Sequence, residues 1–392
     1  MKNAAIFAVI LAMAGNAGAA GFRLAEQDAK ATGMGNSFVA VADNASAVWY
    51  NPAAITGLEG TNIALGTVMV APSMEHESTN GIKDEISGKL HIPPHLYATR
   101  KINDSWSLGL GVNAPFGLST EWDKTTALTR TVATKSEIAA VNYNLNGAYK
   151  ATEKISVAAG LSYVMIDATL NSWHPAGREV QIEGDGNAVG YNAAVMYKHN
   201  DKLNFGANYR SQAKAKLEGD MKNLTALGSV LPVKTELTLP DMLQFGAAYK
   251  YSDKWLFSAE ADYTNWTTYR VITFKKQSDG SVVGTPATKN WQSVWAFRLG
   301  SEYKYSDTWK FRAGTFYDSN PVKEKYFETR VPDTDRVAVS VGAGYTKGNI
   351  TVDASYMYLM FMERTVDSAT ASLDGKYNSV AHLPAITVGY KF

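Results

Sequence analysis

From Thr61 to the C-terminus, apolar residues recur at every second position in segments of about ten residues. The clearest segment begins at Trp106, where apolar side chains occupy the even positions and serine, glycine or asparagine the odd ones. A strand of this length, tilted by about 40°, crosses the apolar band of an outer membrane, with one face toward lipid and the other toward the lumen. The pattern therefore predicts membrane-spanning β-strands with apolar residues outside and small or polar residues inside.

Connections of two lengths separate these segments. Six are short, and most carry an aromatic residue, then Lys, then two or three polar residues; seven are longer and polar. Alternation of the two predicts 14 antiparallel strands with both ends of the chain on the short-turn side, which is the periplasmic side in bacterial barrels. The expected fold is therefore all-β, a 14-stranded antiparallel transmembrane β-barrel over residues 61–392.

Two segments without this alternation precede the barrel. Residues 1–19 carry one early Lys, a short apolar run and an Ala-x-Ala ending, which predicts a signal peptide cleaved after Ala19 or, alternatively, after Ala20. Residues 20–60 contain a cap-and-proline pair, Asn51 and Pro52, which starts a helical turn. Because this segment is too small for its own core and a 14-strand lumen is too wide to fill itself, we expect a partly helical plug inside the barrel.

Composition and charge exclude several classes of function. The chain has no cysteine and a formal net charge of +1, so neither a disulfide framework nor a nucleic-acid partner is expected. No nucleophile is grouped with a base and an orienting residue, so an enzyme is not expected. His91 and His95 flank two prolines without a third ligand nearby, so we expect no metal site and no cofactor.

Several motifs together resemble the FadL/TodX (OmpP1) family of outer-membrane transporters for long-chain fatty acids and other hydrophobic compounds. Their order and spacing carry the resemblance over nearly all of the mature chain: AGF at 20–22, NPA at 51–53, WSLGLGVNAPFGLST at 106–120, YRS at 209–211, LPDM at 239–242 and PDTDR at 332–336.

The resemblance implies that substrate leaves sideways, through a gap made by an inward kink of the third strand. Pro115 removes a ladder donor and Gly117 permits unusual backbone angles, so the stretch around Phe116 is poorly suited to continued pairing. The alternative is that these residues only begin the second long loop. We expect the plug turn Asn51-Pro52-Ala53 to contact this kink.

The resemblance also implies a substrate pocket near the mature N-terminus, which Phe22 is expected to enter. Fatty-acid members place basic side chains in this pocket, but Ser172 and Val294 lie near those positions here. The nearby or inward-facing candidate replacements are His174, Arg178, Lys289, Arg298 and Arg312. For Arg298 and Arg312, an ion-paired barrel lining is the favoured interpretation over a substrate role. The substrate is therefore open between fatty acids and neutral aromatic or aliphatic hydrocarbons.

The sequence thus favours a passive outer-membrane channel for hydrophobic compounds. A general hydrophilic porin is the alternative, but about forty residues of apolar-rich plug are not typical of a wet constriction. The expected partners are hydrophobic small molecules, outer-membrane lipid and lipopolysaccharide, and the barrel assembly machinery during biogenesis. We expect a monomer.

Overall fold

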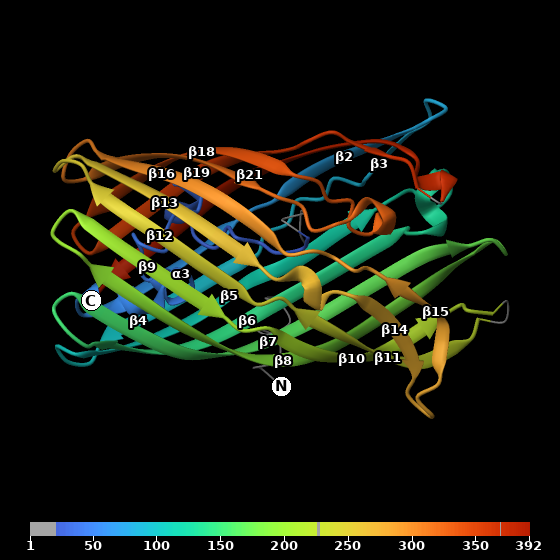
Figure 1. The fold of residues 1–392 in the computed structure, drawn as a ribbon, viewed down its shortest axis with the longest axis horizontal. Coiled ribbons are helices and arrows are strands. Elements are labelled where there is room, and N and C mark those ends of the chain that lie inside the picture. Colours follow the sequence, from blue (N-terminus) through green and yellow to red (C-terminus); the bar gives the residue numbers. More distant parts are fainter. Residues whose placement is uncertain (1–20, 226–227, 369) are drawn as a thin grey trace.

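The computed structural model describes residues 21–225, 228–368 and 370–392, and in that part of the chain one closed antiparallel barrel surrounds the N-terminal segment (Figure 1). The predicted signal peptide, residues 1–19, lies outside the described residues. The strand segments are β1 (Thr61–Val68), β2 (Ala71–Ser78), β3 (Lys83–Glu85), β4 (Pro94–Lys101), β5 (Trp106–Glu121), β6 (Lys135–Lys150), β7 (Ile155–His174), β8 (Arg178–Lys198), β9 (Leu203–Arg210), β10 (Ala213–Lys222), β11 (Val230–Leu239), β12 (Met242–Lys250), β13 (Trp255–Thr264), β14 (Val271–Lys276), β15 (Val282–Thr288), β16 (Val294–Lys304), β17 (Trp309–Asp318), β18 (Arg336–Lys347), β19 (Ile350–Phe361), β20 (Arg364–Val366) and β21 (Gly375–Lys391).

Breaks divide several spanning strands into two segments. The pairs β1–β2, β3–β4, β9–β10, β11–β12, β13–β14, β15–β16 and β19–β20 are each one interrupted strand, so the 21 segments make the 14 strands that the sequence predicts. Strand β21 closes the barrel by pairing antiparallel with β1, where Val388 lies opposite Leu65. Closure matters because lipid supplies no partner for an open sheet edge.

The two faces of the wall differ as predicted. On β5, Trp106, Leu108 and Leu110 are 50%, 48% and 58% exposed on the outside, whereas Ser107 is buried against the lumen. Aromatic pairs such as Trp106 with Tyr149 mark the short-turn end of the barrel. No helix among the described residues is long and apolar enough to cross a membrane.

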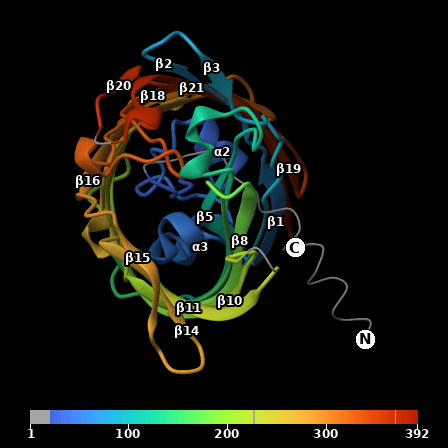
Figure 2. The same cartoon turned by 90° about the vertical axis from the view of Figure 1, so that its right-hand side faces the viewer.

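The long-loop end extends well beyond the wall and carries its own small elements. Strands β7 and β8 form the longest pairing, and the β14–β15 hairpin projects away from the ring (Figure 2). Short 3-10 turns lie in the long connections: η2 (Leu128–Thr131), η3 (Trp266–Thr268), η4 (Glu324–Tyr326) and η5 (Ala371–Leu373).

Residues 21–58 lie inside the ring and contain two short helices and a 3-10 turn (Figure 2). Helix α2 (Ala29–Gly33) begins where the Asp28 carboxylate accepts a hydrogen bond from the Ala31 amide at 3.0 Å. Helix α3 (Ala47–Tyr50) leads into η1 (Pro52–Gly57), which Asn51 caps by accepting from the Ala53 amide at 3.1 Å. These caps satisfy donors that a helix start leaves unpaired.

The plug packs closely against glycines of the barrel wall. A Cβ atom at Gly314 would lie 2.1 Å from the Gly35 amide nitrogen, and one at Gly246 would lie 2.4 Å from Val39 Cγ1. Both distances are far shorter than a van der Waals contact. The plug therefore packs against the wall at positions that carry no side chain. Lys30 adds an ion pair to the wall, with its Nζ 3.2 Å from Glu302. Close packing against the wall glycines and the ion pair of Lys30 with Glu302 therefore both hold the plug in place.

Candidate functional site

The third spanning strand, β5, is irregular at the position where the sequence predicts a kink. Its pairing with β6 shifts between Asn113 and Phe116, so that Ala114 and Pro115 together lie opposite a single residue. On its other side β5 pairs with β4 only as far as Val112. Beyond Val112, a backbone hydrogen bond on this side of β5 is found again at Glu121, whose carbonyl accepts from the amide of Ser87, a residue between β3 and β4. The wall thus contains a gap between β4 and β5.

The N-terminal tail of the plug occupies the place that β4 leaves. The Leu24 amide donates to the Pro115 carbonyl at 2.8 Å, and the Gly117 amide donates to the Phe22 carbonyl at 2.7 Å. Between these bonds, Arg23 and Phe116 form an antiparallel bridge. The tail therefore serves as a short extra strand that satisfies backbone groups freed by the kink.

Gln27 satisfies the remaining groups at the bulge. Its Oε1 accepts from the Ala114 amide at 3.2 Å and from Asn113 Nδ2 at 3.1 Å, while its Nε2 donates to the Ala114 carbonyl at 3.0 Å. Tyr97 on β4 fixes the same residue by donating to the Gln27 carbonyl at 3.0 Å. One plug side chain thus replaces a missing strand partner.

This arrangement corrects the expectation that the Asn51-Pro52-Ala53 turn meets the kink. Asn51 Nδ2 donates instead to the Val39 carbonyl at 2.8 Å and to the Val195 carbonyl on β8 at 3.1 Å. The extended tail, not the capped turn, meets the kink, because only extended backbone can continue a ladder with β5. Asn51 therefore anchors the plug at another part of the wall.

Phe22 lies in a cage of four aromatic rings. Its ring centroid is 4.6 Å from Trp266, 5.5 Å from Tyr269, 5.9 Å from Trp291 and 6.2 Å from Phe116, and its side chain is fully buried. Most of these contacts are edge-to-face, the arrangement that aromatic rings favour. The cage joins the tail directly to the kink, since Phe116 belongs to both.

Gly21 precedes the cage and lies close to an outer loop. Its φ of 66° favours glycine, and a Cβ atom there would lie 2.5 Å from Trp291. The Gly21 amide donates to Asp333 Oδ2 at 2.7 Å. Burial raises the pKa of Asp333 to about 7, against the opposing charge of Arg336. The start of the tail is thus fixed by backbone shape and by a loop carboxyl group.

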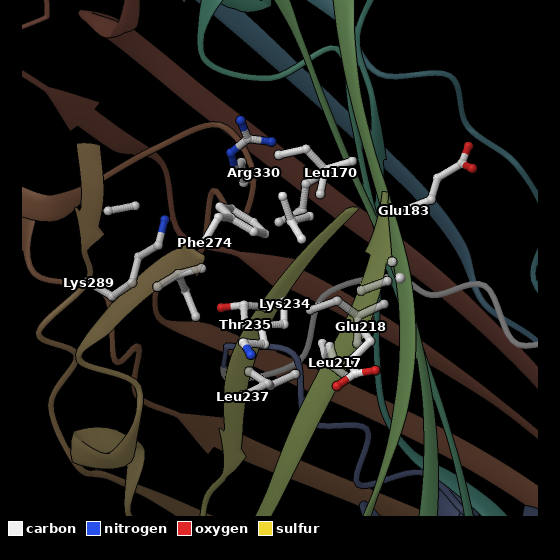
Figure 3. Close-up of a pocket in the computed structure, with 18 of the residues that line it drawn as sticks. Leu170, Glu183, Leu217, Glu218, Lys234, Thr235, Leu237, Phe274, Lys289 and Arg330 are labelled. Atoms are coloured by element: carbon white, nitrogen blue, oxygen red, sulfur yellow. The ribbon is translucent and has the colours of Figure 1, made fainter. Parts of the chain in front are cut away.

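A cavity of about 230 Å³ adjoins the cage, because Tyr269 belongs to both. Figure 3 shows residues that line it. Leu118 on β5 also lines it. Its other walls are mostly apolar and come from β7, β10, β11 and β14, with Leu170, Leu217, Leu237 and Phe274 among them. The cavity and the cage therefore follow one another along a single path.

Three cations, Lys234, Lys289 and Arg330, and two carboxylates, Glu183 and Glu218, are among the residues that line this mostly apolar cavity. Lys289 and Arg330 lie on the same side of it, near Phe274 (Figure 3). Lys289 pairs with Glu328, while Arg330 donates to the Asn171 carbonyl at 3.3 Å. Burial lowers the pKa of Lys289, and the Glu328 carboxylate opposes this effect. Lys289 and Arg330 therefore form a cationic side of the cavity next to the Glu328 carboxylate, whereas Glu183 and Glu218 lie on the opposite side (Figure 3).

Arg298 and Arg312 lie elsewhere, against the plug. Arg298 Nε donates to Asp262 at 3.0 Å, and Arg312 donates to Glu302 at 2.8 Å and to Asp353 at 2.6 Å. Neither residue lines the outer cavity or touches Phe22 in the part of the chain that is described. Asp262 and Glu302 lie on adjacent strands and Asp353 lies two strands away, which favours the interpretation as an ion-paired lining. Residues 21–225, 228–368 and 370–392 contain no cluster of three or more metal-binding side chains.

The comparisons with known proteins agree with this architecture. Residues 10–392 match the family described as outer membrane protein transport protein (OMPP1/FadL/TodX). The chain belongs to this family. Its members are outer-membrane transporters of fatty acids and other hydrophobic compounds, which places this chain in the outer membrane.

Relatives of known sequence cover the chain almost completely. It is 28% identical to the 47 kDa outer membrane protein of Pasteurella multocida, over 97% of this chain and 96% of that one. It is 25% identical to a long-chain fatty acid transport protein of Escherichia coli, over 100% and 98% of the two chains. The crystal structure of a Pseudomonas aeruginosa FadL homologue superposes with a TM-score of 0.85 at 19% identity, covering 95% of this chain and all of that one. That of the Pseudomonas putida toluene transporter TodX gives 0.73 at 16%, covering 97% and 99%.

Proposed function

We propose that the protein is a passive channel for apolar molecules that carry one carboxylate, and that these leave through the gap between β4 and β5. The family supplies the class of substrate, and the relative from Escherichia coli is named for long-chain fatty acids. The observation that carries the narrower proposal is the apolar cavity with Lys289 and Arg330 on one side. Basic groups in such a cavity favour an apolar tail with an anionic head.

Displacement of Phe22 couples binding to opening. A fully buried Phe side chain contributes about 1.5 to 3 kcal/mol, and each buried methylene of a ligand contributes about 0.8 kcal/mol. About two to four methylenes entering the cage therefore match the ring that they replace. Phe22 and Leu24 form backbone hydrogen bonds with β5. When the tail leaves the cage these bonds break, and the kink loses the partners that hold it closed.

A sideways exit avoids returning the solute to water. An apolar chain that continued into the periplasm would lose about 0.8 kcal/mol for each re-exposed methylene, whereas the bilayer accepts it without that cost. A small void of about 30 Å³ lies at the proposed exit, between Gly21, Met74 on β2 and Leu118 on β5. Movement of the tail would enlarge this void toward the gap.

Uptake by liposomes that carry the protein tests the proposal. Palmitate and hexadecane are compared in the wild type, in Lys289→Gln with Arg330→Gln, and in the exposed control Lys214→Gln. We expect the double variant to lose about tenfold in palmitate uptake and to keep hexadecane uptake, because only the acid uses the charge. Equal loss of both, or loss of neither, would exclude carboxylate recognition by this pair. Sucrose flux as fast as palmitate uptake would favour a hydrophilic porin instead.

A further inference from the structure

Two carboxylates on β13 hold different parts of the plug. Glu260 Oε2 accepts hydrogen bonds from the Phe38 and Val39 amides at 2.7 and 2.8 Å. Asp262, two residues further along the strand, holds the N-terminal tail, because its Oδ2 accepts from Arg23 Nη2 at 2.9 Å. Glu260 thus anchors the body of the plug, whereas Asp262 anchors the segment that leaves when the proposed exit opens.

The pair between Arg23 and Asp262 is costly to break if nothing replaces it. Both side chains are buried, with Arg23 5% and Asp262 1% exposed. A buried carboxylate that loses its counter-ion is strongly destabilising, because the interior does not solvate the charge. Release of the tail is therefore favoured by a second cation that stays with Asp262.

Arg298 on β16 is placed to be that cation. Its Nε donates to the same Oδ2 atom of Asp262 at 3.0 Å, and its side chain is 1% exposed. Its Nη1 and Nη2 atoms are buried and form no hydrogen bond with the described residues. The guanidinium lies over the ring of Phe316 on β17, 4.6 Å from its centroid, so wall residues hold it in place. Arg298 therefore stays beside Asp262 when the tail departs.

We propose that Arg298 is a positioning residue that keeps Asp262 paired whenever the tail leaves. In the closed state, Arg23 and Arg298 share the Oδ2 atom of Asp262. In the open state, Arg298 pairs with Asp262 alone and offers the carboxylate an Nη group as well as Nε. An ion pair exists at this point in both states, which makes the two states closer in free energy. The inference rests on the proposed function, since that function requires the tail to move.

The neighbouring carboxylate Glu302 supplies a matched control. It also lies between a plug cation, Lys30 Nζ at 3.2 Å, and a wall arginine, Arg312 Nε at 2.8 Å. Lys30 belongs to helix α2 in the body of the plug, not to the tail. Arg312→Met therefore removes a buried wall arginine of the same kind without changing the partners of Asp262.

Hydrogen–deuterium exchange of peptides covering residues 113–118 measures release of the tail in the assembled protein, because the Gly117 amide donates to the Phe22 carbonyl. In Arg298→Met, opening leaves Asp262 unpaired, so we expect exchange at least about tenfold slower than in the wild type. Arg298→Lys keeps the charge but loses the planar fork, so a smaller slowing of about threefold is expected. Arg312→Met should not slow this exchange.

Exchange at or above the wild-type rate in assembled Arg298→Met or Arg298→Lys would overturn the proposal, because removal of a merely structural arginine loosens the wall. Adding Arg298→Met to Arg23→Gln should cause no slowing, since the tail then makes no ion pair with Asp262. Slowing in that double variant, or equal slowing in Arg312→Met, would also overturn the proposal. Heat-modifiable gel mobility confirms that every variant forms its barrel.

Palmitate uptake by liposomes separates this inference from the proposed function. We expect uptake to fall together with the exchange rate in Arg298→Met. Slower exchange with unchanged uptake would support the role of Arg298 and would instead exclude release of the tail from the transport path.

Discussion

Gln27 offers the sharpest test of how the kink is held closed. Replacing it with Ala removes the partners of the Ala114 amide and carbonyl, two backbone groups within a buried part of the wall. Each buried group left unpaired costs about 1 to 3 kcal/mol, so about 2 kcal/mol is the smallest expected loss. Local opening of the kink should then become about 30-fold more frequent.

Hydrogen–deuterium exchange of peptides covering residues 113–118 measures this opening. We expect about 30-fold faster exchange there in Gln27→Ala, and unchanged exchange in the pairing of β7 with β8. Gln27→Glu keeps the acceptor for Ala114 and loses only the donor, so its effect should be intermediate. The exposed Gln212→Ala is the matched control. Exchange at wild-type rate in Gln27→Ala would refute the role assigned to this side chain.

Further predictions concern the plug. Phe22→Ala should lower the free energy of unfolding by about 3 kcal/mol or more, since it empties the aromatic cage, and thermal melting measures this; an unchanged melting temperature would show that the ring is not held there. Gly314→Val should displace the plug and expose Lys30 to amine-reactive labelling in an assembled barrel, whereas Val at half-buried Gly147, where a Cβ atom meets nothing within 4 Å, should not. Asn51→Ala should cost about 1 kcal/mol through the lost cap and slow uptake without preventing assembly; misfolding would mean that this position serves the barrel itself.

The barrel could be predicted from the sequence because each strand carries its own evidence. Alternation places Trp106, Leu108 and Leu110 outside without knowledge of any other strand. The same alternation fails at Ala114, which it places outside and which is in fact buried. The bulge between Asn113 and Phe116 reverses the faces there, since one extra residue changes which side each later residue points to.

The site was less accessible to such reasoning. Pro115 and Gly117 identified the kink, because proline and glycine limit pairing wherever they occur. Gln27 could not be found, since its contact with Ala114 spans 87 residues and nothing local encodes it. Trp266, Trp291 and Arg330 lie in connections without periodicity, so only the fold brings them to the cage and the cavity.

A reversible crosslink between the tail and β5 tests the central claim most directly. Arg23 and Phe116 form the bridge between the two bonds of this short ladder, a non-hydrogen-bonded pair whose Cα spacing of about 4.5 Å suits a disulfide. Because the chain has no cysteine, Arg23→Cys with Phe116→Cys introduces a single possible bond. If release of the tail opens the exit, palmitate uptake by the oxidised protein should fall at least about tenfold below that of the same protein after reduction. Equal uptake in the two states would show that substrate passes while the tail stays paired with β5, and would contradict the account.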